Sequence, residues 1–324
     1  MRSIQEYQQL FFLHLSKAIH VKEPEGLYDP VHYILQLGGK RLRPVLTLMA
    51  AEIFGGDYKK ALDAALAVEV FHNFSLVHDD IMDAAPLRRG QQTVHEKWDI
   101  NTGILSGDVM LILAYRLFEN YEAETFRKLA MLFSKTAIEV CEGQQYDVEF
   151  EDRTDVTIPE YLKMIEYKTA VLVGASLQMG AIVAEASTED AQAIYDFGRN
   201  LGIAFQLQDD YLDAFGDPES FGKQVGGDII ENKKTYLFLQ AQLRSSSKEA
   251  EALQHLFSIR PTDPSQKIRN VKAIFESSGA TTATRDAIST YTQKAFDILE
   301  TLEITDKNRS VLRTFGETLM NRTF

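Results

Sequence analysis

Two aspartate clusters of identical spacing are the residues of this chain best suited to chemistry. They are Asp79-Asp80-Ile81-Met82-Asp83 and Asp209-Asp210-Tyr211-Leu212-Asp213. Positions four apart share one face of a helix, so Asp79 and Asp83 are expected to project together, with Asp80 beside them. Such carboxylates repel one another and are unfavourable near a helix C-terminus, so a cation must compensate them. Mg²⁺ takes carboxylate oxygens, usually together with the phosphates of a substrate.

Each cluster ends a stretch that is typical of an interior helix. Residues 61–77 are apolar around the whole predicted helix, which favours a buried element over a surface one. A single cluster would be equally well explained as a solvated acidic helix end. The second copy favours a functional reading, in which two carboxylate clusters face one another across a cavity and hold metal ions around one highly charged anion.

Basic residues concentrate in two short blocks. Asp29-Pro30 predicts the start of a helix that ends at Gly38-Gly39, and Lys40-Arg41-Leu42-Arg43 follows just before Pro44 opens another helix. Basic residues next to the free N–H groups of a helix start suit an anion, although a solvated basic loop is the simpler alternative. The exposed loop after Pro86 carries Arg88-Arg89-Gly90, whose guanidinium groups suit bidentate phosphate binding.

The order of these blocks, from Gly38 to Lys233, resembles the polyprenyl synthetase family of trans-isoprenyl diphosphate synthases. The resemblance implies an Mg²⁺-dependent head-to-tail condensation of isopentenyl diphosphate with an allylic diphosphate. It implies an all-α fold, a single large antiparallel helical bundle around a deep central cavity. One domain is expected over residues 1–324, and the family is usually homodimeric.

The resemblance also assigns roles residue by residue. It places about three Mg²⁺ ions, replaceable by Mn²⁺, on Asp79, Asp83 and Asp209, with Asp80 and Asp213 as further ligands or as residues behind them. The residues implied to bind isopentenyl diphosphate are Lys40, Arg43, His72 and Arg89. Those implied to act on the allylic diphosphate and its cation are Arg88, Lys168, Thr169, Gln206, Lys223 and Lys233. By residue type alone, His72 would be a core histidine and Lys168 a snorkelling lysine.

The segment after the second cluster and the end of the chain leave some assignments open. Lys223 lies in a glycine-rich segment, 216–228, that is read as a mobile flap. Many members have glycine before the next lysine, and this chain has Asn232, so the choice between Lys233 and Lys234 is open. The chain ends with Arg322 in place of a basic tail, so closure of the site by the tail stays open too.

Product length is predicted from the residues that precede the first cluster. A helix rises about 1.5 Å per residue, so four or five residues correspond to about one isoprene unit. Ser75 is small, whereas Phe74 and Phe71 are bulky, and in the family the fifth position before the first motif is a main length stop. This pattern resembles synthases of geranylgeranyl diphosphate, with farnesyl diphosphate second. The sequence leaves the preferred allylic starter open.

Composition limits the remaining classes. The chain of 324 residues is 45% hydrophobic with a formal net charge of −13, which argues against nucleic acid as the main partner. The one cysteine, Cys141, excludes an internal disulfide and fits a reducing cytoplasm. The apolar stretch 170–184 contains Ser176 and Gln178 and is too short for a membrane span. A soluble cytoplasmic protein is therefore expected.

Two other functions are compatible with part of this pattern. A class I terpene cyclase shares the first motif, but its second metal motif normally pairs Asn or Asp with Ser/Thr and Glu. A non-catalytic regulatory subunit usually loses one aspartate motif, and this chain keeps both. Product analysis distinguishes all three readings.

Overall fold

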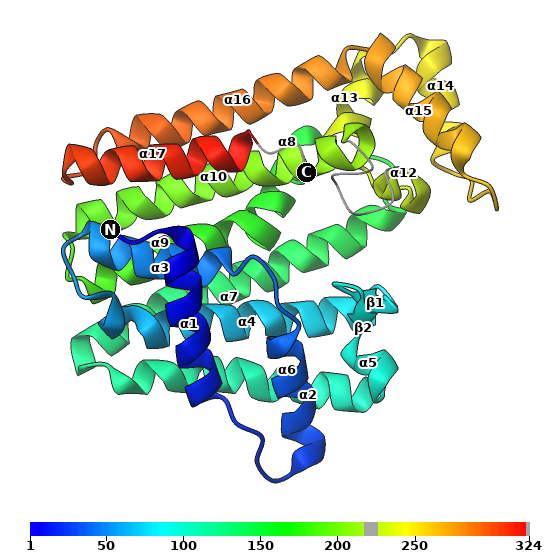
Figure 1. Cartoon of the computed structure of the whole chain (residues 1–324). Helices are drawn as coiled ribbons and strands as arrows, with labels where there is room; N and C mark the ends of the chain where they lie inside the picture. The colour runs from blue at the N-terminus through cyan, green and yellow to red at the C-terminus, as the bar shows by residue number, and fades with distance from the viewer. Residues whose placement is uncertain (217–225, 322–324) are drawn as a thin grey trace. The chain divides into compact units, whose positions relative to one another are not determined.

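The structure, a computed structural model, describes residues 1–216 and 226–321. Nearly all regular structure in these residues is helical, and the two strands β1 (Leu87–Arg88) and β2 (Gln91–Gln92) form one short antiparallel hairpin. Figure 1 shows the helices in order along the chain. This confirms the predicted all-α class. The expectation of a single domain stays a prediction, because the chain divides into two compact units, each formed by two separate segments.

Unit 1 comprises Met1–Lys135 and Ala175–Tyr195. Its remaining elements, in chain order, are α1 (Ile4–Ala18), α2 (Glu25–Gln36), α3 (Leu42–Ile53), η1 (Tyr58–Ala61), α4 (Leu62–Met82), α5 (Val94–Lys97), α6 (Ile100–Arg116) and η2 (Leu117–Asn120).

Unit 2 comprises Thr136–Gly174 and Asp196–Phe324. The chain passes between the units within α7 (Ala123–Asp152), α9 (Val171–Val183) and α10 (Thr188–Phe215). The other elements of unit 2 are α8 (Ile158–Ile165), the π-helical turn η3 (Glu166–Ala170), α12 (Gly227–Glu231), α13 (Tyr236–Arg244), α14 (Ser247–Leu256), α15 (Ser265–Ser277), α16 (Ala280–Leu299) and α17 (Asp306–Met320).

Helix α4 is the central element of unit 1. It packs against α3 and, most extensively, against α6. Its buried residues lie on several sides, since Ala64 to Val70 are all buried. An apolar residue at nearly every position allows contact with neighbours on all sides, which is why this sequence forms an interior helix. The helix therefore carries the first aspartate cluster out of a rigid core.

The predicted start of the second helix is wrong. Helix α2 begins at Glu25, four residues before Asp29, and Pro30 lies inside it. Pro30 is the sixth residue of the helix, past the four N–H groups that have no intrahelical acceptor, so it removes one i→i−4 hydrogen bond. The buried residues Val31, Ile34 and Leu35 hold the helix against its neighbours.

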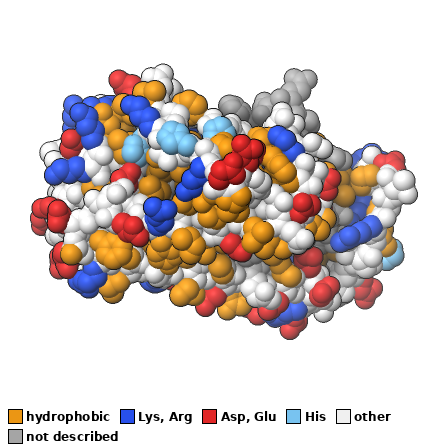
Figure 2. Space-filling model, turned by 90° about the horizontal axis from the view of Figure 1, so that it is seen from below, with side chains coloured by type: hydrophobic (Ala, Val, Ile, Leu, Met, Phe, Trp, Pro, Cys, Tyr) orange, Lys and Arg blue, Asp and Glu red, His pale blue; other side chains and the backbone are white. Residues whose placement is uncertain are grey.

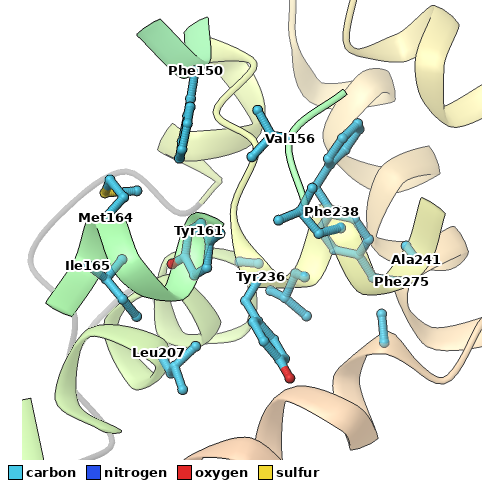
Figure 3. Close-up of a cluster of buried hydrophobic side chains, with 14 of the residues drawn as sticks. Phe150, Val156, Tyr161, Met164, Ile165, Leu207, Tyr236, Phe238, Ala241 and Phe275 are labelled. Atoms are coloured by element: carbon cyan, nitrogen blue, oxygen red, sulfur yellow. The ribbon is translucent and has the colours of Figure 1, made fainter. Parts of the chain in front are cut away.

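The core of unit 2 gathers side chains from α7, α8, α10, α13 and α15. Figure 3 shows Tyr161, Met164 and Ile165 of α8 lying among Phe150, Leu207 and Tyr236 in this cluster. Helix α8 starts with a capping box, in which Thr157 accepts from the Glu160 backbone and Glu160 accepts from the Thr157 backbone. This cap and this core fix the short helix that precedes the Lys168-Thr169 turn.

Candidate active site

The first aspartate cluster occupies the last turn of α4, and its three carboxylates differ in surroundings. Asp79 is half-buried, and Asp83 is exposed and ends the helix, its backbone N–H donating to the Asp79 carbonyl at 2.8 Å. Asp80 is only 1% exposed. Its two carboxylate oxygens each accept from Arg88 Nε at 2.8 Å, and Arg88 Nη2 lies 2.7 Å from Oδ1. Asp80 is thus engaged in orienting Arg88.

The hairpin β1–β2 brings the two basic blocks of unit 1 together. Its turn residues Arg89 and Gly90 have φ angles of 54° and 75°, as two-residue hairpin turns require. The Arg89 guanidinium donates to the Gly38 carbonyl and lies against Gly39, where the Cβ of any other residue would collide with it. The predicted exposed loop is therefore a short hairpin that docks on the Gly38-Gly39 turn.

Arg43 and His72 form the half-buried part of this basic site. Arg43 Nη1 lies 3.3 Å from His72 Nε2. Burial lowers the pKa of His72 well below its ordinary value, and the charges of Arg43 and Arg89 lower it further. Neutral His72 can therefore accept from Arg43. Arg43 Nε is buried and has no hydrogen-bond partner among the described residues. A buried donor left open beside several cationic groups fits an anionic ligand.

Lys40 differs from Arg43 in its surroundings. Its side chain is exposed, and its backbone carbonyl accepts from Gln8 Nε2 at 2.7 Å. Of the four residues predicted to bind isopentenyl diphosphate, the structure clusters Arg43, His72 and Arg89 and leaves Lys40 at the edge.

Glu69 completes this site, although the sequence did not lead us to predict it. It is 2% exposed and forms a buried ion pair with Arg41, the left-handed residue at the start of α3 with φ of 47°. Asn73 Nδ2 donates to Glu69 Oε1 at 2.9 Å. Glu69 thus fixes the side chain of Arg41, which lies between Lys40 and Arg43 in the sequence. The available signal was a glutamate inside an otherwise apolar helix, three residues before His72, because a buried carboxylate needs a cationic partner.

The three residues predicted to control product length lie on the N-terminal side of Asp79 in α4. Phe74 is 9% exposed, and its ring centroid lies 5.5 Å from that of Phe71 and 4.8 Å from that of His78. Phe71 also contacts Phe133, with 5.1 Å between ring centroids. Ser75 is half-buried and donates to the His72 carbonyl at 2.9 Å. Phe71 therefore belongs to a fixed aromatic cluster, and Phe74 lies at its edge.

In unit 2, Lys168 and Thr169 lie in the π-helical turn η3. Such turns are rare and are frequently found at functional sites. Lys168 Nζ donates to Asp147 of α7. Gly143 of α7 lies directly against the backbone of Tyr167 and Lys168, with no room for a Cβ. The close approach at Gly143 therefore fixes where η3 presents Lys168.

A partly buried hydrogen-bond chain links Thr169 to the second aspartate cluster. Thr169 Oγ1 donates to Gln206 Oε1 at 3.2 Å, and Gln206 Nε2 donates to Asp210 Oδ1 at 3.0 Å. Tyr161 OH donates to the other oxygen of Asp210. Burial, followed by the charge of Asp228, raises the pKa of Asp210 well above its ordinary value. Tyr161 was not predicted as a site residue, because a tyrosine on the apolar face of a helix resembles an ordinary core residue.

The other two aspartates of this cluster are half-buried. The carboxylate of Asp213 accepts from the backbone N–H of Asp228 at 3.0 Å, and its carbonyl accepts from Gly226 at 2.7 Å. Asp213 therefore fixes the start of α12. Burial and the nearby charge of Asp213 raise the pKa of Asp228 to about 7. Lys223 lies outside the described residues, as does Arg322.

The structure separates the roles of Lys233 and Lys234. Lys234 Nζ donates to the carbonyls of Phe150 and Glu151, each at 2.7 Å, and so caps the end of α7. Lys233 is exposed, and its Nζ lies 3.1 Å from Glu231. Lys234 is committed to the backbone, so Lys233 is the residue of the pair whose side chain remains accessible.

The donor set in both units fits a hard divalent cation. Within residues 1–216 and 226–321, no three His, Cys, Asp or Glu side chains form a ready-made metal cluster. Mg²⁺ needs only one or two protein carboxylates when substrate phosphates supply the other oxygens. Burial and, after it, the charge of Asp213 raise the pKa of Asp228, while the charge of Lys233 lowers it, so carboxylates and a lysine lie close together here. Carboxylate oxygens of this kind are suitable ligands for Mg²⁺.

Comparison with known proteins gives consistent matches over almost the whole chain. A family model described as polyprenyl synthetase matches residues 24–277. The chain is 36% identical over 323 residues to a short chain isoprenyl diphosphate synthase of Methanothermobacter thermautotrophicus, covering 99% of this chain and 98% of that one.

Solved structures give the same result. A crystal structure of a geranylgeranyl pyrophosphate synthase is 56% identical, with a TM-score of 0.96 and 99% of each chain covered. A geranylgeranyl pyrophosphate synthase from Corynebacterium glutamicum, complexed with isoprenyl diphosphate and magnesium, is 27% identical, with a TM-score of 0.84 and 98% and 97% covered. No helix among the described residues is long and apolar enough to cross a membrane.

Proposed function

The chain belongs to the polyprenyl synthetase family and is a prenyltransferase, and on this premise we propose that it makes geranylgeranyl diphosphate. The reaction joins isopentenyl diphosphate, head to tail, to an allylic diphosphate. The observation that carries the proposal is the clustering of Arg43, His72 and Arg89 in unit 1, with a buried guanidinium donor left open. Two such substrates require two diphosphate sites, and this cluster supplies one of them.

In the proposed mechanism, the first site holds isopentenyl diphosphate. Arg43 and Arg89 bind its diphosphate, and neutral His72 accepts from Arg43 and so keeps that guanidinium pointed at the ligand. Lys40, exposed at the edge, adds charge from solvent. Guanidinium groups bind diphosphate oxygens in pairs, which fixes the position of the reacting double bond.

The allylic diphosphate is assigned to the residues around the aspartate clusters. Asp79, Asp83 and Asp209 would hold Mg²⁺, about three ions with substrate bound. When bound, Mg²⁺ supplies Lewis-acid stabilisation of the leaving diphosphate. Arg88, Lys168 and Lys233 add fixed positive charge for the oxygens that become more negative as the carbon–oxygen bond breaks. Lys223 is assigned the same role.

The remaining steps join the two substrates. The allylic carbon that loses diphosphate forms a bond to the terminal carbon of the isopentenyl double bond. This leaves the positive charge on the other carbon of that double bond. The CH₂ group between that carbon and the diphosphate-bearing carbon then loses a proton, and the product is an allylic diphosphate longer by one isoprene unit. The oxygens of Thr169 and Gln206, held in line by Asp210 and Tyr161, are assigned to face the cationic carbon. No general base is assigned among these side chains, so the released diphosphate accepts the proton.

Product length is assigned to the aromatic residues of α4. Phe74 stops the growing chain, and Phe71 lies behind it in a cluster with Phe133. The small side chain of Ser75 lets the chain pass. Geranylgeranyl diphosphate is therefore the proposed product, and farnesyl diphosphate the second candidate.

We further propose that the enzyme is a homodimer in the cytoplasm. Helix α6 exposes Ile100, Ile104, Leu105 and Ile112, with relative exposures between 41% and 58%. Hydrophobic side chains gather on the face seen in Figure 2. The four exposed positions of α6 recur at helical spacing. Such an apolar stripe is typical of a subunit contact. Replacement of Leu105 by lysine should yield monomers in sedimentation velocity runs, whereas an unchanged mass would reject this contact.

Product analysis tests the proposed function. Purified protein is incubated with Mg²⁺, labelled isopentenyl diphosphate and each allylic starter in turn. We expect labelled geranylgeranyl diphosphate as the longest main product. A terpene cyclase would release hydrocarbon or alcohol without consuming isopentenyl diphosphate, and a regulatory subunit would release no product.

A further inference from the structure

Lys267 is a buried lysine that the proposed mechanism does not use. It lies in the first turn of α15 and is 3% exposed. Its Nζ donates to the Ile259 carbonyl at 3.0 Å, to the Ile230 carbonyl at 3.4 Å and to the side-chain oxygen of Asn232. All three acceptors are neutral, and within residues 1–216 and 226–321 Lys267 forms no ion pair.

This placement is costly for a lysine. A buried ammonium group loses its hydration, and it is normally paired with a carboxylate. The positive end of the α15 dipole is also at this turn, which disfavours a cation. Burial, together with the charge of Arg260, lowers the pKa of Lys267. An apolar residue would fill the same space at lower cost, so the hydrogen bonds of Lys267 require an explanation.

The acceptors of Lys267 surround the turn that carries Lys233. Asn232 ends α12 in a left-handed conformation with φ of 63°. The backbone N–H of Lys233 donates to the Asp228 carbonyl at 2.9 Å, and that of Thr235 donates to the Lys233 carbonyl at 3.0 Å. Lys267 therefore holds the turn immediately before Lys233.

The turn is also held immediately after Lys233, because Lys234 donates to the end of α7. Between these two anchored positions only the side chain of Lys233 is exposed. A lysine side chain is flexible, so the position of its ammonium group depends on a fixed backbone beneath it.

We propose that Lys267 is a positioning residue that fixes the Asn232 turn and so sets the affinity of Lys233 for the allylic diphosphate. The proposal rests on the proposed function of Lys233. It also explains Asn232 itself. Glycine would adopt the left-handed conformation more easily, but asparagine also offers a side-chain oxygen to Lys267.

The test begins with Lys267→Met, which keeps the length of the side chain and removes its donors. We expect the KM for the allylic substrate to rise about tenfold, as for the loss of one or two buried hydrogen bonds, with the KM for isopentenyl diphosphate within twofold of wild type. Arg269→Met is the matched control, since it removes an exposed charge two residues away on α15, and it should leave both constants unchanged.

A double variant separates positioning from general destabilisation. If Lys267 acts through Lys233, then Lys267→Met adds nothing to the allylic KM of Lys233→Ala, because effects on one shared interaction are not additive. Independent, multiplying effects would overturn the proposal, as would equal increases in the KM values for both substrates. Asn232→Gly, which keeps the turn and removes one acceptor, should change the allylic KM in the same direction by a smaller factor.

Amide hydrogen exchange distinguishes this inference from the proposed function. We expect Lys267→Met to accelerate exchange at the amides of Lys233 and Thr235 about tenfold, and Arg269→Met to leave them unchanged. Unchanged exchange in the Lys267→Met protein would overturn the positioning role. If exchange accelerates while Lys233→Ala leaves the allylic KM at the wild-type value, Lys267 still fixes the turn, but the assignment of Lys233, and with it the proposal, is wrong.

Discussion

Arg88 donates from Nε to both carboxylate oxygens of Asp80 at 2.8 Å, and the pair differs sharply in exposure, with Asp80 at 1% and the Arg88 side chain at 26%. Removal of Arg88 and removal of the Asp80 charge should therefore lower the free energy of unfolding by unequal amounts. Removal of Arg88 leaves a buried carboxylate without its cation, whereas removal of the Asp80 charge leaves a guanidinium that water can still reach.

We expect Arg88→Ala to lower the free energy of unfolding by about 3 kcal/mol and Asp80→Asn by about 1 kcal/mol. Urea unfolding followed by circular dichroism measures both values. Asp80→Asn should also leave the Mg²⁺ concentration for half-maximal activity near that of the wild type, whereas Asp79→Asn should raise it. Equal metal requirements in these two variants would make Asp80 a ligand of the same rank as Asp79.

The two diphosphate sites should respond separately to mutation. Arg43→Ala and Lys40→Ala are expected to raise the KM for isopentenyl diphosphate more than the KM for the allylic substrate, and Lys233→Ala is expected to do the reverse. Arg43 should have the larger effect, about tenfold or more, because it is half-buried beside His72 while Lys40 is exposed. Steady-state kinetics with each substrate varied in turn would reject this division if both constants rose together.

The surroundings of His72 predict a dependence of stability on pH. Its pKa is well below the ordinary value of 6.5 because of burial and the neighbouring arginine residues. The unfolded chain thus binds this proton more readily than the folded chain. As far as His72 is concerned, the free energy of unfolding therefore has its full value above about pH 6.5. It decreases as the pH falls toward the lowered pKa.

The variant His72→Gln keeps an acceptor for Arg43 but cannot titrate. We expect its thermal midpoint to fall less than that of the wild type between pH 7 and pH 5, as measured by differential scanning fluorimetry. Parallel profiles for the two proteins would show that His72 does not contribute to the pH dependence.

Phe74 and Phe71 should control product length to different degrees and at different costs. Phe74→Ala is expected to shift products toward chains longer than geranylgeranyl diphosphate, and Phe71→Ala to add to the shift in the double variant. Phe71 is 1% exposed in an aromatic cluster, so its replacement should also cost about 3 kcal/mol of stability or more. Chromatography of the dephosphorylated products measures the shift, and an unchanged distribution in Phe74→Ala would place the stop elsewhere.

The sequence predicted those parts of the molecule that depend on local pattern. The continuous apolar character of residues 61–77 was sufficient to predict the interior helix α4, and the resemblance to the polyprenyl synthetase family predicted the all-α class. The start of α2 could not be predicted, because Asp29-Pro30 resembles a helix start although the helix begins at Glu25. There, tertiary packing of Val31 and Ile34 outweighed the local signal.

Roles that depend on a partner distant in sequence could not be read in advance. Lys233 and Lys234 are adjacent and identical in type, and only the end of α7 separates them, by accepting from Lys234. Asp80 is equivalent to Asp79 in the motif, and only the β1–β2 hairpin, which returns Arg88 to it, gives it a different role. Lys267 lies outside every motif, and its contacts arise from the packing of α15 beside α12.

The proposed dependence of the reaction on the aspartate clusters is the centre of this account, and turnover of the Asp79→Ala protein tests it most directly. Asp79 lies in the last turn of α4 and its replacement removes no core side chain, so the variant should fold with a circular dichroism spectrum like that of the wild type. We predict that, with Mg²⁺, isopentenyl diphosphate and farnesyl diphosphate at saturation, its turnover falls by about three orders of magnitude or more, as for the loss of a central electrostatic group. Turnover close to that of the wild type would contradict the account.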